Sequence, residues 1–129
     1  MRFKSVLLLV VLLSVCTKVY TEDDRDKLGP TAPAPVVKAD TIEFRVSGNF
    51  PSAIVRHSDS INGLTQTTTG LPYFASVSST RENIFLSLEA SASGPGNLQI
   101  QIVVNGQIFR ESNSTLFSPF LSVNGTYRK

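Results

Sequence analysis

The strongest local signal in the chain is the run Leu98-Gln99-Ile100-Gln101-Ile102-Val103-Val104-Asn105-Gly106-Gln107. Its first half alternates apolar side chains with glutamines, which is the period of a half-buried strand. Asn105 and Gly106 tolerate the positive φ that both central positions of a two-residue turn require. The run therefore predicts a β-hairpin in which residues 98–104 pair with residues 107–111.

The same period of two recurs on both sides of this hairpin. Residues 42–46 and residues 84–88 place an apolar side chain at every second position. No window of the chain shows a long amphipathic helical pattern. Pro72 opens a further β-prone stretch, and proline has no donor for a central ladder, so this strand is expected at a sheet edge. The expected strands cover residues 41–46, 53–57, 65–69, 72–77, 84–89, 98–104, 107–111 and 117–127.

Seven or eight short strands of this kind predict an all-β domain over residues 40–129. Two-sheet packing in about 90 residues is typical of an immunoglobulin-like β-sandwich. The composition is 41% hydrophobic with eight Phe and no Trp, so Phe and the aliphatic residues must fill its core. The better-filled face of each strand predicts which side chains point inward. We expect the core to contain Phe44, Leu86, Leu88, Ile100 and Ile102.

Residues 1–21 have the order of a secretory signal helix. Arg2 and Lys4 precede an apolar run over residues 6–13, and small residues follow. Lys18 interrupts the run before it reaches the roughly 20 residues that a transmembrane helix needs. We expect cleavage after Cys16 or after Thr21, and export to the periplasm or the extracellular space.

Cys16 has two readings that stay open. It is either an ordinary leader residue or, because residues 13–16 resemble a bacterial lipobox, the lipidated N-terminus that anchors the protein to a membrane. Val15 stands where the lipobox usually has Gly or Ala. Residues 22–39 follow as a charged and Pro-rich spacer, which either is a disordered N-terminus or holds the domain away from a membrane.

Charge and titratable residues exclude several function classes. From Asp40 onward the chain has six basic and six acidic residues, so the domain has no net charge and no electrostatic reason to bind nucleic acid. His57 is the only histidine, next to Ser58 and Asp59, but neighbours on a strand point apart and do not form a triad. We expect a strand-end residue at His57, a non-enzymatic protein, and no metal or other cofactor.

Two groups of polar residues carry weaker signals. The acidic residues Asp59, Glu82, Glu89 and Glu111 are spread along the chain, and we expect them on solvated faces. Asn113 and Asn124 each begin an Asn-x-Thr pattern, which is an N-glycosylation acceptor in an exported eukaryotic chain and has no such meaning in a bacterium.

Five stretches of the domain share their order and spacing with a known family. They are Thr41-Ile42-Glu43-Phe44-Arg45-Val46-Ser47-Gly48, Ser52-Ala53-Ile54-Val55, Gly70-Leu71-Pro72-Tyr73, Leu86-Ser87-Leu88-Glu89-Ala90, and the run from Leu98 to Gln107 quoted above. Together they resemble the periplasmic part of the mycobacterial membrane protein small (MmpS) family over most of residues 41–123.

This resemblance implies a role as well as a fold. MmpS proteins assist transporters of the resistance, nodulation and division type in exporting lipids and siderophores. The resemblance implies an accessory protein of the cell envelope, whose partner is a membrane transporter or its lipid-like cargo. The chain departs from the family in three ways: it has Tyr73 where Trp is common, no cysteine pair near the late strands, and a leader that looks cleavable or lipidated.

The alternative is a secreted immunoglobulin-like interaction module that binds a protein or a glycan and has no transport role. In either case the candidate partner-binding residues are Leu71, Pro72, Tyr73 and Phe74, at the start of the expected edge strand. Two readings of the aromatic pair stay open. Either both rings belong to the core, or one ring is exposed beside a free strand edge, where a partner segment could lie.

Overall fold

The computed structural model describes residues 32–129. The chain divides into the units Met1–Pro35 and Val36–Lys129, and the second contains all the strands described below. Residues 32–39 are exposed and have no regular structure. The predictions for the signal helix, for Cys16 and for the first part of the spacer lie outside the described residues.

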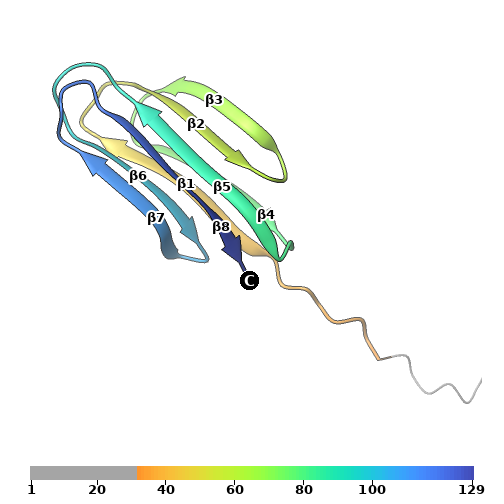
Figure 1. The fold of residues 1–129 in the computed structure, drawn as a ribbon. Helices are drawn as coiled ribbons and strands as arrows, with labels where there is room; N and C mark the ends of the chain where they lie inside the picture. Colours follow the sequence, from red (N-terminus) through yellow and green to blue (C-terminus); the bar gives the residue numbers. More distant parts are fainter. Residues whose placement is uncertain (1–31) are drawn as a thin grey trace, which may run out of the picture. The chain divides into compact units, whose positions relative to one another are not determined.

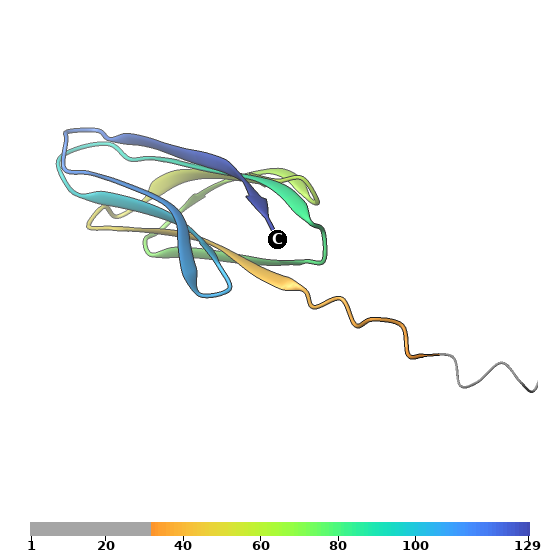
Figure 2. The same cartoon turned by 60° about the horizontal axis from the view of Figure 1, so that its bottom comes forward.

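Residues 40–129 form an eight-stranded β-sandwich, which confirms the predicted fold class (Figure 1). All strand pairs are antiparallel, and the two sheets have the orders β4-β1-β6-β7 and β3-β2-β5-β8. Figure 2 shows the two sheets as separate layers. The strands are β1 (Asp40–Gly48), β2 (Ala53–Asp59), β3 (Gly63–Thr69), β4 (Tyr73–Ser79), β5 (Asn83–Ser91), β6 (Leu98–Val104), β7 (Gln107–Ser114) and β8 (Phe120–Arg128).

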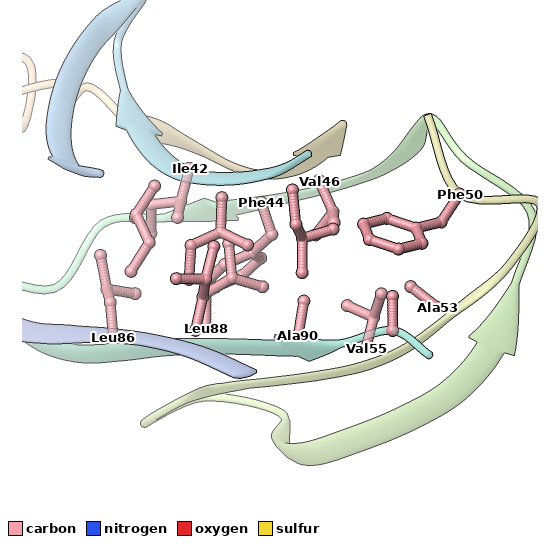
Figure 3. Packing of buried hydrophobic residues seen from close by; sticks show 14 of the residues in the cluster. Ile42, Phe44, Val46, Phe50, Ala53, Val55, Leu86, Leu88 and Ala90 are labelled. Carbon is pink, nitrogen blue, oxygen red and sulfur yellow. The ribbon is translucent and has the colours of Figure 1, made fainter. Parts of the chain in front are cut away.

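The hydrophobic core lies between the layers and is built by the alternation of the two central strand pairs. β1 and β6 face it from one sheet, and β2 and β5 from the other (Figure 3). All five predicted core residues are fully buried, as are Ile42, Val55 and Ile84. The prediction of the inward faces is therefore confirmed. A strand with one apolar face gains the most free energy when that face is buried.

The predicted hairpin is confirmed as β6 and β7. Val104 pairs with Gln107, and the two turn residues Asn105 and Gly106 have φ values of 51° and 79°. Positive φ at both positions is the requirement that predicted the turn. The register of the pair shifts once, between Ile102 and Val103. β7 continues to Ser114, three residues beyond the predicted end.

The β2–β3 connection is shorter than the gap of residues 58–64 between the two predicted strands, because only residues 60–62 lie outside β2 and β3. β2 continues to Asp59 and β3 begins at Gly63. The prediction that Asp59 is solvated is wrong, since its side chain is buried. Its Oδ1 accepts the backbone N–H groups of Ile61 at 2.7 Å and Asn62 at 2.6 Å. A buried carboxylate is tolerated there because it satisfies the donors of the turn.

The two sides of the sandwich differ in how closely the sheets approach. On one side β7 and β8 lie side by side, and the Phe109 ring meets the Tyr127 ring edge-on at 5.8 Å. A Cβ on Gly125 of β8 would lie 3.1 Å from the Phe109 ring, so glycine makes this close approach easy. On the other side β3 and β4 are the outer strands, and each pairs with a single neighbour. β3 and β4 thus each have a free edge on this side of the sandwich.

Candidate functional site

The predicted partner-binding residues lie where the chain enters β4. Leu71 and Pro72 precede the strand and are joined by a cis peptide bond, and Tyr73 and Phe74 are its first two residues. β4 is an outer strand, bonded to β1 alone, so the prediction of an edge strand is confirmed. Proline at this place removes no ladder bond, because it stands before the strand begins.

Tyr73 points into the space between the sheets. Its ring is half-buried and packs against the core, and its hydroxyl lies 3.0 Å from Nε2 of His57 on β2. Burial raises the pKa of the Tyr73 hydroxyl above its ordinary value. Tyr73 thus bridges the open side of the sandwich from inside and offers little of its ring to a partner.

Phe74 points the other way, as the next residue of a strand must. Its side chain is 59% exposed on the outer face of the β4-β1-β6-β7 sheet. The guanidinium of Arg45, its neighbour on β1, lies 6.0 Å from the ring centroid and is paired with the carboxylate of Glu43. Of the two readings of the aromatic pair, the geometry fits the second, and the exposed ring is that of Phe74.

The four predicted residues therefore do not form one surface. Leu71 and Tyr73 pack against the core, whereas Pro72 and Phe74 are exposed. Phe74 and the free edge of β4 are the parts of the predicted site that a partner segment can reach. Whether a partner binds there stays a prediction.

His57 is not the strand-end residue that we expected. It lies within β2, its side chain faces the core and is only 7% exposed, and its ring stacks on Phe44 at 4.6 Å. Burial lowers its pKa below the ordinary value, and the charge of Asp59 opposes this effect. The sequence signal that was overlooked is the period of two: His57 follows Ala53 and Val55 on the inward face.

Ser58 points to the opposite face of β2 from His57, as predicted, whereas Asp59, two positions on, shares the buried face with His57 but is used by the following turn. Ser58 Oγ lies 2.7 Å from Ser87 Oγ on β5, and Asp59 accepts the amides of the following turn. Tyr73 is the one hydrogen-bond partner of the His57 ring within residues 32–129, and Nδ1 has none there. Across the same residues, no three His, Cys, Asp or Glu side chains gather in a way that would hold a metal ion.

A polar cluster that the sequence did not predict joins both ends of the domain to the hairpin turn. Asn105 Nδ2 donates to Asp40 Oδ1 at 2.7 Å, and Asn105 Oδ1 accepts the Thr41 N–H at 2.9 Å. Lys129 Nζ lies 3.5 Å from Asp40 Oδ2 and donates to the Lys38 carbonyl. Asp40 is buried, and the hydrogen bond from Asn105 lowers its pKa, helped by the charge of Lys129 and opposed by desolvation.

A second exposed surface lies around the β7–β8 loop, at the end of the strands away from the Asp40–Asn105 cluster. Leu116, Phe117 and Phe120 are exposed there, and Phe120 lines a shallow hollow of about 340 Å³ together with Ile54. The two Asn-x-Thr patterns begin at exposed residues, Asn113 at the end of β7 next to this loop and Asn124 within β8.

Comparison with known proteins adds no family to this description. No protein-family model matches the chain, and no curated protein matches it. The resemblance to the MmpS family therefore stays an expectation from the sequence. In the part of the chain from residue 32 onward, no helix is both long enough and apolar enough to cross a membrane.

Proposed function

We propose that this protein is a non-enzymatic, exported binding module of the cell envelope, which captures an extended segment of a partner protein along the free edge of β4. The observation that carries the proposal is the combination of an uncharged seven-residue edge strand with one exposed aromatic ring, Phe74. In this mode the strand's backbone supplies hydrogen bonds and the ring supplies apolar contact area.

The free edge of β4 has none of the usual protection of exposed strands. Proteins commonly guard an edge with charged side chains, a bulge or a covering element. β4 carries no charged residue, and its pairing with β1 is regular over Val46–Tyr73 to Asp40–Ser79. β7, the other outer strand of the same sheet, carries Arg110 and Glu111, has an irregular register and lies against β8.

Phe74 is placed to act as an anchor for such a segment. Aromatic side chains carry a large share of binding energy at many protein interfaces. The Phe74 ring is exposed on the sheet face directly beside the free edge, so a segment paired with β4 would lay alternate side chains next to it. Arg45 leans over the ring and adds a cation to this surface.

The envelope setting rests on the leader in residues 1–21 and on the MmpS resemblance. Within that setting, the partner class that we favour is a membrane transporter of the resistance, nodulation and division type. The chain then acts as an accessory protein held beside the transporter, through Cys16 if this residue is lipidated.

The test is capture of envelope proteins by the wild type and by Phe74→Ala, from solubilised membranes of the source cells. The proposal expects chemical cross-linking to identify a wild-type partner whose yield falls at least several-fold with Phe74→Ala. Phe85→Ala is the matched control, because Phe85 is also an exposed phenylalanine but lies on β5 of the other sheet. Both variants should keep the melting temperature of the parent within a few degrees.

Two outcomes contradict the proposal. Equal capture by the wild type and by Phe74→Ala would mean that the binding site is not on β4. Recovery of the protein only as a free extracellular product, with no envelope partner, would instead favour a secreted interaction module. Cell fractionation with N-terminal sequencing of the product separates these cases and also identifies the cleavage site.

A further inference from the structure

We infer that the free edge of β4 also pairs with β4 of a second copy of this chain, so that two copies join their β4-β1-β6-β7 sheets around a two-fold axis at Ser76. The inference rests on the proposed use of β4 as a binding edge and goes beyond it by naming another occupant. The dimer is the state of the protein before capture, and a partner segment competes with the second copy for the same edge.

The sequence of β4 is complementary to itself in the antiparallel direction. β4 reads Tyr-Phe-Ala-Ser-Val-Ser-Ser from residue 73 to residue 79, and Ser76 is its central residue. Centred there, Phe74 lies opposite Ser78 of the second copy, and Ser76 opposite Ser76. On the outer face each large ring thus meets a small hydroxyl side chain, which avoids a clash between the two phenylalanines.

The inner face pairs equally well in this register. Ala75 lies opposite Val77 of the second copy, and Tyr73 opposite Ser79. Tyr73, Ala75 and Val77 pack against the core but are only half-buried, because no strand lies along the free edge of β4. A second β4 would bury part of this apolar surface, which gives the pairing a driving force besides the backbone hydrogen bonds.

Charge does not oppose this contact. β4 has no charged residue, and Glu43 and Arg45, the nearest charges across the pair, are on β1 and are paired with each other. The same two-fold axis brings the two β3 strands to the same side of the dimer. β3 is uncharged as well, so no like charges face each other there.

The other outer strands fit self-pairing less well. β7 and β8 lie against each other, and the Phe109–Tyr127 contact ties them together. β3 offers threonines on its inward face in place of the apolar side chains of β4, so its self-pairing would bury less apolar surface. Pairing of β3 with β4 of another copy is heterologous and leaves unpaired edges after two copies, whereas β4 with β4 is closed after two copies.

A single strand pair is at the small end of specific interfaces, so we expect a reversible, concentration-dependent dimer. The test is sedimentation equilibrium over a concentration series, with the chain purified after expression of the full sequence. The average mass of the wild type should rise from the monomer mass towards twice that value. Ser76→Lys and Ser76→Glu each place like charges together on the axis, and each should stay monomeric at every concentration.

The decisive arm mixes the two variants in equal amounts. Opposite charges then meet on the axis, so the mixture should recover dimers while neither variant alone does. Glu43 lies across from Ser76 within one copy, so a local effect would favour Lys over Glu and would not produce recovery on mixing. Ser122→Lys on β8, an exposed position away from this edge, is the control and should dimerise like the wild type.

Circular dichroism of each variant establishes that it is folded. A wild type that is monomeric throughout the series overturns the inference, and so does a Ser76→Lys variant that is folded and dimeric, or a mixture without recovery. Failure of the dimer and failure of the proposed function give different results. If the chain is monomeric but Phe74→Ala still reduces capture of the partner, only the dimer is contradicted. If the chain dimerises but Phe74→Ala captures the partner as well as the wild type does, only the proposed function is contradicted.

Discussion

Asn105 in the β6–β7 turn donates a hydrogen bond of 2.7 Å to Asp40 at the start of β1, across 65 positions of sequence. The turn backbone takes part as well, because the Asn105 N–H donates to the Thr41 carbonyl at 2.8 Å and Asn105 Oδ1 accepts from the Thr41 N–H. One residue thus shapes a hairpin turn and ties that turn to the first strand of the domain. The two roles have different physical origins and can be separated by mutation.

Asn105→Val should lower the free energy of unfolding by on the order of 1 kcal/mol or more, because a β-branched residue is strained at positive φ. Asn105→Gly is the matched variant, since it keeps the backbone freedom and loses only the side-chain bonds to Asp40 and Thr41. We expect urea unfolding to place Asn105→Gly between the parent and Asn105→Val. Equal stability of Asn105→Val and the parent would mean that valine is not strained at this position of the turn.

Leu88→Ala should cost about 2 to 5 kcal/mol, because Leu88 is fully buried at the centre of β5 and truncation leaves a cavity. A loss of that size could unfold a domain whose total stability is about 5 to 15 kcal/mol. Phe85→Ala, on the exposed face of the same strand, should cost much less. A cost below about 0.5 kcal/mol for Leu88→Ala is incompatible with an inward-facing side chain.

Asp40 should make the domain sensitive to strong acid. Its pKa lies below the ordinary value of 3.8 in the folded protein, so its carboxylate stabilises the fold above that pH. This contribution is lost as the pH falls through the folded-state pKa, where the folded protein takes up the proton that the unfolded chain already holds. Stability measured between about pH 5 and pH 2 should fall less steeply for Asp40→Asn than for the parent. Parallel curves of stability against pH for the parent and Asp40→Asn would mean that the Asp40 carboxylate is not the source of the acid sensitivity.

His57 should add a second pH dependence, nearer neutrality. Its folded-state pKa lies below the ordinary value of 6.5, so the unfolded chain is protonated first as the pH falls. Stability should therefore decrease below about pH 6.5, by at most about 1.4 kcal/mol per pH unit, and level off below the folded-state pKa. Urea unfolding of His57→Gln should lack this slope. A slope that persists in His57→Gln must come from another group.

The local pattern of residues was sufficient to predict the strands, the hairpin and the core. Alternation with period two identifies which face of a strand is apolar, and Asn105-Gly106 requires a specific turn geometry, so neither depends on distant residues. The local sequence was therefore enough to assign residues 71–74 to the start of β4 without knowledge of how the strands pair. The prediction of an edge strand from Pro72 was correct, but Pro72 precedes β4 and takes no part in its ladder, so the place of β4 at the edge is set by the order of the strands in the sheet.

The tertiary structure decided which of these residues a partner can reach, and which polar groups are buried. Phe74 is outward and Tyr73 inward because of the register between β4 and β1, which no local pattern contains. Asp40 is buried together with Asn105 of the hairpin turn and Lys129 of the chain end. His57 faces inward by the local alternation of β2, but its hydrogen-bond partner Tyr73 comes from the other sheet. Such contacts depend on the order of strands in two sheets, and a sequence that alternates with period two is compatible with many such orders.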